Sequence, residues 1–288
     1  MTPTRPGEVI ATIRSLLPSL LPTEQAVAAV LLARSTDIVE LSSQQVADLA
    51  GASRATVVRT CQSLGYTGYQ QLRVLLARDA GYAVVPEPAP VAAPPADAAG
   101  IVAATFHAIA AAADGMTALL DPDELTRSVE TLAVADRLVV VGNGLSAPLA
   151  QDAAARLVSI GRPAEAPMDV IGQQISARLL GAGDALLAIS GSGSNAATVA
   201  SARAATTAGA TVISVTAFAR SPLTTTSTLS LVVTAPELTF QDELTLASRV
   251  PHSILIEGLV AAVTKRLGTS ATTAKNLALD IISENLAD

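Results

Sequence analysis

Four short apolar runs alternate with longer helical stretches in the second half of the chain, and this alternation constrains the fold more than any other feature. The runs are LVVV (138–141), ALLAI (185–189), TVISV (211–215) and LSLVV (229–233). Helices are expected to begin near Ser146, Ile171 and Ser194, with a last helix over about 244–267. Strands separated by helices at this spacing are joined by right-handed crossovers and lie parallel. The sequence therefore predicts an α/β fold with a doubly wound parallel sheet.

The composition agrees with this fold and excludes several classes of protein. Half of the residues are hydrophobic but only 2% are aromatic, so the core consists of aliphatic side chains, which suit helices packed on a parallel sheet. The Ala-rich stretch from Ile101 is interrupted by His107 and Asp114, and the N-terminus lacks the apolar core of a signal peptide. The single cysteine, Cys61, excludes an internal disulfide and a multi-cysteine metal site. We expect a soluble cytoplasmic protein with no membrane contact, cofactor or metal.

A proline-dense segment divides the chain. Five prolines fall within residues 86–95. Proline lacks a backbone donor and fixes φ, so this segment is expected to be an extended spacer; the alternative is a surface loop inside one domain. We predict a first domain at 1–80, a Pro- and Ala-rich linker at 81–100 and a second domain at 101–288.

The first domain is expected to be entirely helical. Its helical stretches cover residues 7–17, 23–34, 43–50, 53–64 and 69–79. Two more helices, over about 101–120 and 123–134, are expected before the first strand. Residues 1–80 hold seven arginines and six acidic residues, whereas 81–288 hold eleven basic and nineteen acidic ones, within a net charge of −7. The opposite signs of charge indicate different partners for the two parts.

The stretch LSSQQVADLAGASRATVVRTCQSLGYTGYQQLR (41–73) predicts two short helices joined by a tight turn. Ser43 is expected to cap the first helix, which has Leu49 among its inward positions. Gly51 permits the positive φ at which that helix ends, and Ser53 caps the second. Such a pair is a helix-turn-helix, whose second helix lies in the DNA major groove. The alternative is a structural pair of helices that carries solvent-exposed arginines.

Six polar residues of this pair are placed to meet DNA. Arg59 is the first choice for a bidentate contact with guanine, and small Ala55 allows a close approach. Ser53, Arg54 and Thr56 are suited to phosphate or base contacts near the N-terminus of the second helix. Ser43 and Gln44 of the first helix are suited to contacts with the DNA backbone. Cys61 is expected to be a buried hydrophobic residue. The predicted DNA-binding residues are Ser43, Gln44, Ser53, Arg54, Thr56 and Arg59.

Two strand-to-helix junctions, VVVGNGLSAPLA (139–150) and LAISGSGSNAATVASARAA (187–205), share one chemistry. Glycines let the backbone curl, while hydroxyls and unpaired helix N–H groups point into the crevice at the ends of the strands. Ser190, Ser192, Ser194 and the amides near Asn195 would supply several donors to one phosphate. A plain turn remains the alternative at both junctions.

The first junction also spells G-x-G-x-x-G/A at Gly142, Gly144 and Ala147, which is a dinucleotide-binding pattern. A dinucleotide-binding site also requires an acidic residue about 20 positions after these glycines, at the end of the second strand, where it hydrogen-bonds a ribose. Glu165 has this spacing but lies between two prolines, in a poor strand. The glycine pattern alone is a weak signal for a nucleotide.

Residues 41–76 and the two Ser/Gly junctions resemble the RpiR-type (RpiR/MurR) family of bacterial transcription regulators, over about residues 7–267. The resemblance implies a helix-turn-helix domain followed by a flavodoxin-like sugar-isomerase-like (SIS) domain that binds phosphosugars. Ser146 matches the family's first-loop serine, and "SGSGSN" matches its S-x-S-G-x-T motif except that Asn195 replaces the threonine. Glu257 corresponds roughly to an acidic position of the family. The implied ligand-binding residues are Gly144, Ser146, Ser190, Ser192, Gly193, Ser194, Asn195 and Glu257.

We therefore expect a transcription regulator that binds DNA, at a palindromic operator, as a homodimer or homotetramer, and senses a phosphorylated sugar or a related anionic metabolite. The main alternative is a sugar-phosphate isomerase with an appended helical domain, and a third is a module that uses the helix pair for protein contacts. Isomerisation needs a general base. The groups available for this role are His107, His252 and Glu257. The favoured interpretation of each is a structural role, so no catalytic residue is predicted.

Overall fold

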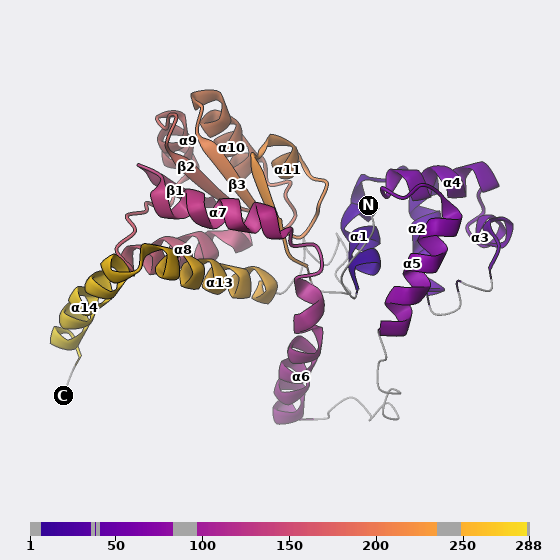
Figure 1. Cartoon of the computed structure of the whole chain (residues 1–288), viewed down its shortest axis with the longest axis horizontal. Coiled ribbons are helices and arrows are strands. Elements are labelled where there is room, and N and C mark those ends of the chain that lie inside the picture. Colours follow the sequence, from indigo (N-terminus) through magenta and orange to yellow (C-terminus); the bar gives the residue numbers. More distant parts are fainter. Residues whose placement is uncertain (1–6, 36–37, 39–40, 83–96, 235–248, 287–288) are drawn as a thin grey trace. The chain divides into compact units, whose positions relative to one another are not determined.

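The computed structural model describes residues 7–35, 38, 41–82, 97–234 and 249–286, and these fall into two compact units (Figure 1). The chain up to Leu119 belongs to the first unit, together with Thr234, and the second unit begins at Leu120. The proline run at 86–95 lies outside the described residues, so the linker at 81–100 stays a prediction. The helix before it extends to Tyr82, and the helix after it begins at Ala98.

The N-terminal part of the first unit is helical, as predicted. Its helices are α1 (Glu8–Leu16), α2 (Pro22–Ala33), α3 (Ser43–Leu49), α4 (Arg54–Ser63) and α5 (Tyr69–Tyr82), with a 3-10 turn at Leu17–Ser19. The buried carboxylate of Asp79 on α5 accepts hydrogen bonds from the N–H groups of Gly7, Val9 and Ile10, at 3.1, 2.7 and 3.2 Å. This side chain therefore satisfies the free donors at the start of α1 and ties the two ends of the domain together.

Helix α6 (Ala98–Met116) is apolar but exposed. Met116 is its one buried residue, while Ile101, Val102 and Phe106 are more than half exposed. In the described part of the chain it is also the one helix long and apolar enough to cross a membrane by length and composition. That criterion is weak support for a membrane span, because cores of other proteins meet it and because polar residues interrupt this helix.

The second unit contains a sheet of four parallel strands in the order β1-β2-β3-β4, which confirms the predicted fold class. The strands are β1 (Leu138–Gly142), β2 (Ala185–Ile189), β3 (Thr211–Thr216) and β4 (Leu229–Val232). The helices are α7 (Pro122–Val134), α8 (Ala147–Ser159), α9 (Val170–Arg178), α10 (Ala196–Ala208), α11 (Pro222–Thr226), α13 (Val250–Leu267) and α14 (Thr269–Glu284). Helices α11 and α14 were not predicted. The segment 244–248 of the predicted last helix lies outside the described residues.

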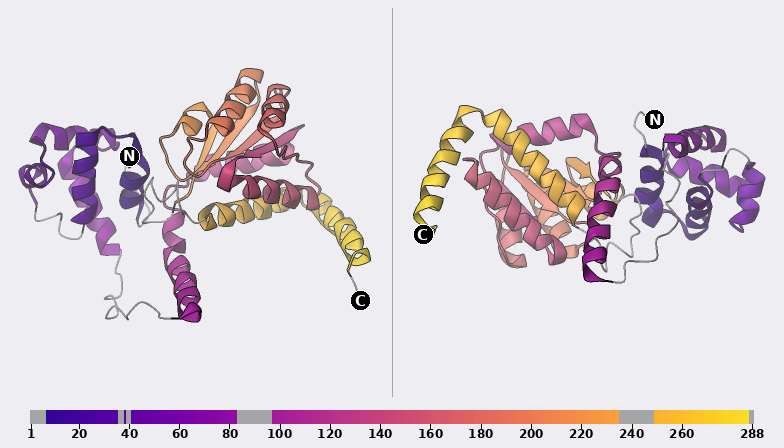
Figure 2. Two further views of the ribbon diagram at one scale, coloured as in Figure 1. Left: turned by 180° about the vertical axis from the view of Figure 1, so that it is seen from behind. Right: turned by 90° about the horizontal axis from the view of Figure 1, so that it is seen from below.

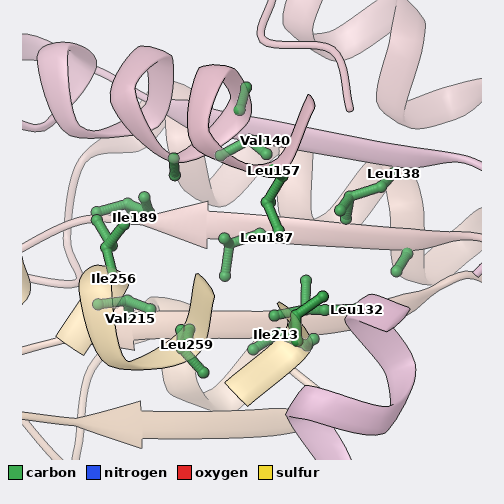
Figure 3. Packing of buried hydrophobic residues seen from close by; sticks show 14 of the residues in the cluster. Leu132, Leu138, Val140, Leu157, Leu187, Ile189, Ile213, Val215, Ile256 and Leu259 are labelled. Atoms are coloured by element: carbon green, nitrogen blue, oxygen red, sulfur yellow. The ribbon is translucent and has the colours of Figure 1, made fainter. Parts of the chain in front are cut away.

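Helices cover both faces of the sheet (Figure 2). On one face, alternate strand residues such as Val140, Leu187 and Ile213 pack against α7, α8 and α13 (Figure 3). On the other face, the intervening residues such as Val139 and Leu186 pack against α9, α10 and α11. Every residue of β1 and β2 is buried, as expected for parallel strands covered on both sides.

The path of the chain makes a switch point between β1 and β2. After β1 the chain passes through α8 to Glu165, which bridges in parallel to Val139. Since β2 occupies the other side of β1, this bridge lies on the side away from β2. After β2, by contrast, the chain passes through α10 to β3, across the opposite face. The two connections diverge at the carboxyl ends of β1 and β2, which is the position where open α/β sheets bind ligands.

Candidate functional site

Two loops leave the sheet side by side at the switch point. Gly142 ends β1 and is paired in register with Ile189, which ends β2. Because neighbouring strands lie about 4.8 Å apart, the loop after Gly142 and the loop after Ile189 begin next to each other. The two predicted junctions therefore meet at one edge of the sheet.

The first loop turns at glycines and buries a hydroxyl. A side chain at Gly142 would place its Cβ 2.6 Å from the carbonyl oxygen of Ser146, and Gly144 has a φ of +59°. Ser146 is 4% exposed, and its hydroxyl makes no hydrogen bond within the described part of the chain. The N–H groups of Gly144 and Leu145 are likewise without a described partner. Because α8 begins at Ala147, these donors lie at the positive end of a helix.

The backbone of the second loop is held from outside by the turn between β3 and α11. Ala217 donates its N–H to the carbonyl of Gly191, and Leu223 donates to the carbonyl of Gly193, both at 2.9 Å. Gly193 has a φ of +61°, and a Cβ there would lie 2.2 Å from the Oγ of Ser221. The carbonyl oxygens of Gly191 and Gly193 are thus already used as acceptors by the neighbouring turn. The N–H groups left without a hydrogen bond among the described residues include those of Gly191, Ser192, Ala196 and Ala197.

The side chains of the second loop differ in their roles. Ser190 is 3% exposed, and its hydroxyl has no partner in the described ranges. The Ser192 hydroxyl accepts a 3.3 Å hydrogen bond from the N–H of Ser194. The Ser194 hydroxyl in turn donates to the carbonyl of Ser192. Asn195 is the N-cap of α10, because its Oδ1 accepts from the N–H of Thr198 at 3.1 Å. Free hydroxyls and amides at two adjacent helix N-termini are the kind of donors that bind a phosphate group.

Three polar residues beneath these loops were missed by the sequence analysis: Asn143, Gln173 and Thr198. The Nδ2 of Asn143 donates to the Oε1 of Gln173 at 2.8 Å and to the Oγ1 of Thr198 at 3.0 Å. Asn143 stands inside the quoted G-N-G pattern and Thr198 stands three residues after Asn195, but Gln173 carries no local signal. Their association depends on tertiary structure.

Within one copy of the chain, Glu257 lies away from the two loops, so its place in the ligand set stays a prediction. Its carboxylate pairs with the guanidinium of Arg156 at 3.4 Å, and its side chain is 63% exposed. Arg156 lies on α8, ten residues beyond Ser146, which is about 15 Å along a helix. The plain structural role that the sequence favoured for this carboxylate agrees with the geometry.

His252 on α13 is enclosed. It is 1% exposed, and neither ring nitrogen has a hydrogen-bond partner among the described residues. Burial, and to a lesser extent the Arg249 guanidinium, lower the pKa of His252 to about 4. Such an imidazole is neutral at pH 7 and too weak a base to be a good proton acceptor there.

The geometry of Glu165 does not suit a dinucleotide site. The residue pairs with Val139, three residues before the end of β1, and so lies about 10 Å from the carboxyl edge. Its carboxylate bonds to the guanidinium of Arg137 at 3.0 Å, at the opposite end of the strand. Among the described residues there is also no group of three or more His, Cys, Asp or Glu side chains that could hold a metal ion.

In the first unit, α3 and α4 pack together around a tight turn, as the sequence predicts. Gly51 has a φ of +59°, and Ser53 caps α4 by accepting from the N–H of Thr56 at 3.1 Å. The cap of α3 is Ser42 rather than Ser43: the Ser42 hydroxyl accepts from the N–H of Gln45, and the Gln45 side chain accepts in return from the N–H of Ser42. A glutamine three residues after the cap favours this capping box.

The side chains expected to meet DNA divide into exposed and buried ones. Gln44, Ser53, Arg54 and Arg59 are exposed, and Ser43 is half-buried. Thr56 is only 7% exposed, so it does not face a groove; its hydroxyl accepts from the Arg59 guanidinium at 3.4 Å and thereby steadies that side chain.

Two other residues of the helix pair test the predicted packing. Leu49 was expected to point inward but is 55% exposed, because α3 ends at this residue. Cys61 is fully buried, as predicted, and burial raises the pKa of its thiol to about 12. The thiol is therefore protonated at neutral pH, which makes it unreactive.

Comparisons with known proteins match both units. Residues 7–81 match the family model of the helix-turn-helix domain of the rpiR family, and residues 131–254 match that of the SIS domain. The chain is 32% identical over 265 residues to the HTH-type transcriptional regulator HexR of Pseudomonas aeruginosa, covering 90% of each chain. It is 29% identical over 266 residues to an uncharacterized HTH-type transcriptional regulator of Caldanaerobacter subterraneus, covering 90% of this chain and 91% of the other.

A solved structure covers both units as well. The NanR protein of Vibrio vulnificus complexed with ManNAc-6P is 25% identical and aligns with a TM-score of 0.61. The alignment covers 97% of this chain and 100% of that protein.

Proposed function

The chain belongs to the RpiR family of helix-turn-helix transcriptional regulators, and from this premise we propose that it reads an operator through α4 and senses a sugar phosphate at the switch point of its SIS domain. One observation carries the sensing half. Two adjacent loops offer the hydroxyls of Ser146 and Ser190 together with amides that lack a partner in the described residues. A phosphate fills such a surface with charge-assisted hydrogen bonds.

The comparisons support the same ligand class. NanR, to which this chain is similar over its whole length, is complexed with ManNAc-6P, a sugar phosphate. Asn195 does not argue against a phosphate, because its Oδ1 is used to cap α10 and its place at the mouth of the helix needs no hydroxyl. We therefore assign the effector to the phosphorylated sugars or closely related anions.

Removing both inner hydroxyls of the second loop is expected to abolish stabilisation by the effector. A sugar phosphate at 100 times its Kd stabilises the folded state by about 2.7 kcal/mol, which raises the Tm of a unit of this size by roughly 5–10 °C. The variant Ser190→Ala/Ser192→Ala is expected to lose this shift, because two donors to the phosphate are gone. The measurement is thermal unfolding with ManNAc-6P, other hexose 6-phosphates and inorganic phosphate.

The matched control is Ser159→Ala. Ser159 is an exposed serine at the far end of α8, about 20 Å from the loops, and among the described residues its hydroxyl donates only to the carbonyl of Arg156. This variant is expected to keep the full shift. A double variant that responds to the effector as the wild type does would place the ligand elsewhere.

The DNA-binding half rests on the exposed face of α4. One short helix reads only a few base pairs, so we propose a homodimer or homotetramer that recognises the two halves of a palindromic operator in the cytoplasm. The effector would act by favouring one arrangement of the paired DNA-binding domains, so operator affinity must differ with and without it. Neither His252 nor Glu257 is placed as a base for isomerisation, so we propose a regulator without catalytic activity.

Arg59→Ala is expected to weaken specific operator binding by about 1–3 kcal/mol and to relax the preference at one base pair, because a bidentate contact with guanine is lost. Gel-shift titrations against the operator and its single-base variants measure both effects. Gln62→Ala is the control, since Gln62 is also exposed on α4 but one turn further from its N-terminus. If Arg59→Ala binds the operator with unchanged affinity and selectivity, another residue reads the base.

A further inference from the structure

A continuous chain of hydrogen bonds runs beneath the two loops of the sensing site. Asn143 of the first loop donates from Nδ2 to Gln173 Oε1 at 2.8 Å and to Thr198 Oγ1 at 3.0 Å. Thr198 Oγ1 lies 3.3 Å from the Oδ1 of Asn195, the residue that closes the second loop. The two loops are thus joined by side chains as well as by the sheet.

The direction of these hydrogen bonds is set by the side-chain amide of Gln173. Gln173 is 2% exposed, and its Nε2 donates to the carbonyls of Gly142 at 3.3 Å and Pro167 at 3.1 Å. Because its amide nitrogen faces two carbonyls, its Oε1 must be the acceptor that faces Asn143. The Asn143 amide nitrogen is then the matching donor, and its second hydrogen is directed to Thr198.

Thr198 connects Asn143 of the first loop to Asn195 of the second loop by hydrogen bonds. The residue is fully buried. Its hydroxyl accepts from Asn143 and has one proton, which it donates to Asn195 Oδ1. The same oxygen of Asn195 also accepts the N–H of Thr198, so the cap of the 13-residue helix α10 and the bridge share one atom. Each of these residues has at least one hydrogen-bond partner in the network, and a connected polar network of this kind holds its elements in one arrangement.

We propose that Asn143, Gln173 and Thr198 are positioning residues for the effector. They fix the separation of the two loops, so that the hydroxyls of Ser146 and Ser190 and the helix N-termini meet the same phosphate. None of the three needs to touch the ligand. Ordering the loops before binding removes a conformational cost that the ligand would otherwise have to offset. This inference rests on the proposed sensing function and adds the residues that shape its site.

Thr198→Val tests the proposal, because valine keeps the shape of threonine and removes the hydroxyl. The bridge is then broken between Asn143 and Asn195, and the affinity for the sugar phosphate is expected to fall about tenfold. Thr198→Ser keeps the hydroxyl and is expected to bind within about twofold of the wild type. Calorimetric titration with ManNAc-6P, other hexose 6-phosphates and inorganic phosphate, well below the Tm of each variant, measures the Kd.

The serine variant separates positioning from a general loss of packing, since it loses the methyl group but retains the bridge. If the valine variant does not fold, Asn143→Asp serves instead, because it replaces the donor with an acceptor that faces Gln173 Oε1. Equal affinities for the valine and serine variants overturn the positioning role while leaving the sensing function intact. A wild-type protein that binds none of the probes overturns the sensing function itself, and the positioning role with it.

Discussion

Replacing Gly193 with alanine is expected to abolish effector binding and to lower the free energy of unfolding of the SIS unit by about 2–5 kcal/mol. The glycine has a φ of +61°, a conformation that costs alanine about 1 kcal/mol or more. The added Cβ would also lie 2.2 Å from the Oγ and 2.5 Å from the Cβ of Ser221. These atoms cannot coexist there, so the loop has to move.

The movement would reach the proposed phosphate donors directly. The carbonyl of Gly193 accepts from the N–H of Leu223, and its N–H donates to the carbonyl of Ser190, both at 2.9 Å. A shift of this residue therefore pulls the loop away from α11 and displaces Ser190 and Ser192. Effector binding by calorimetry and chemical denaturation of the same sample measure the two consequences.

Gly144→Ala is the matched control for the stability measurement alone, because Gly144 belongs to the proposed binding loop. Gly144 has nearly the same φ, +59°, but a Cβ there would meet no atom within 4 Å. The control therefore isolates the backbone term, about 1 kcal/mol, from the collision at Gly193. If the two variants lose the same free energy of unfolding, the collision with Ser221 does not contribute to the destabilisation.

The sequence was sufficient for those features that depend on local patterns. The four strands occur where apolar runs with turn residues at both ends predicted them, because a parallel strand covered on both faces favours a nearly continuous apolar run. Gly51 and Ser53 were identified for the same reason: a helix end that needs a positive φ and a cap that needs a side-chain oxygen leave few choices. The two Ser/Gly loops were placed together because the carboxyl ends of parallel strands share an edge.

Features that depend on partners distant in the sequence were missed. Gln173 reaches Asn143 across 30 positions, and nothing around it in the chain distinguishes it from a surface glutamine. Glu257 was assigned by its approximate position in a family pattern, which does not specify that Arg156 pairs with it on the neighbouring helix. Thr56 was read as a groove-facing polar residue, whereas its hydroxyl can satisfy itself locally with Ser53 at 2.9 Å and remain buried.

Replacing Asp79 with alanine is expected to destabilise the N-terminal helical domain by about 3 kcal/mol or more, which corresponds to a fall in Tm of roughly 12–24 °C. The carboxylate is fully buried and accepts from three N–H groups at the start of α1. Alanine leaves the buried N–H of Val9 and the partly buried N–H groups of Gly7 and Ile10 without this acceptor, and it removes a negative charge from the positive end of the helix. Asp79→Asn keeps one carbonyl acceptor and is expected to lie between alanine and the wild type.

This loss is large compared with the stability of a domain of this size, which at about 0.05–0.15 kcal/mol per residue is only several kcal/mol. Operator binding is therefore expected to fail at temperatures where the SIS unit, whose core is separate, still binds the effector. Asp48→Ala is the control, because Asp48 is exposed on α3 and its carboxylate accepts, within the described part of the chain, only from the side chain of Gln44. If Asp79→Ala unfolds with the same midpoint as Asp48→Ala, the three hydrogen bonds do not stabilise α1, and the domain is closed by its apolar contacts alone.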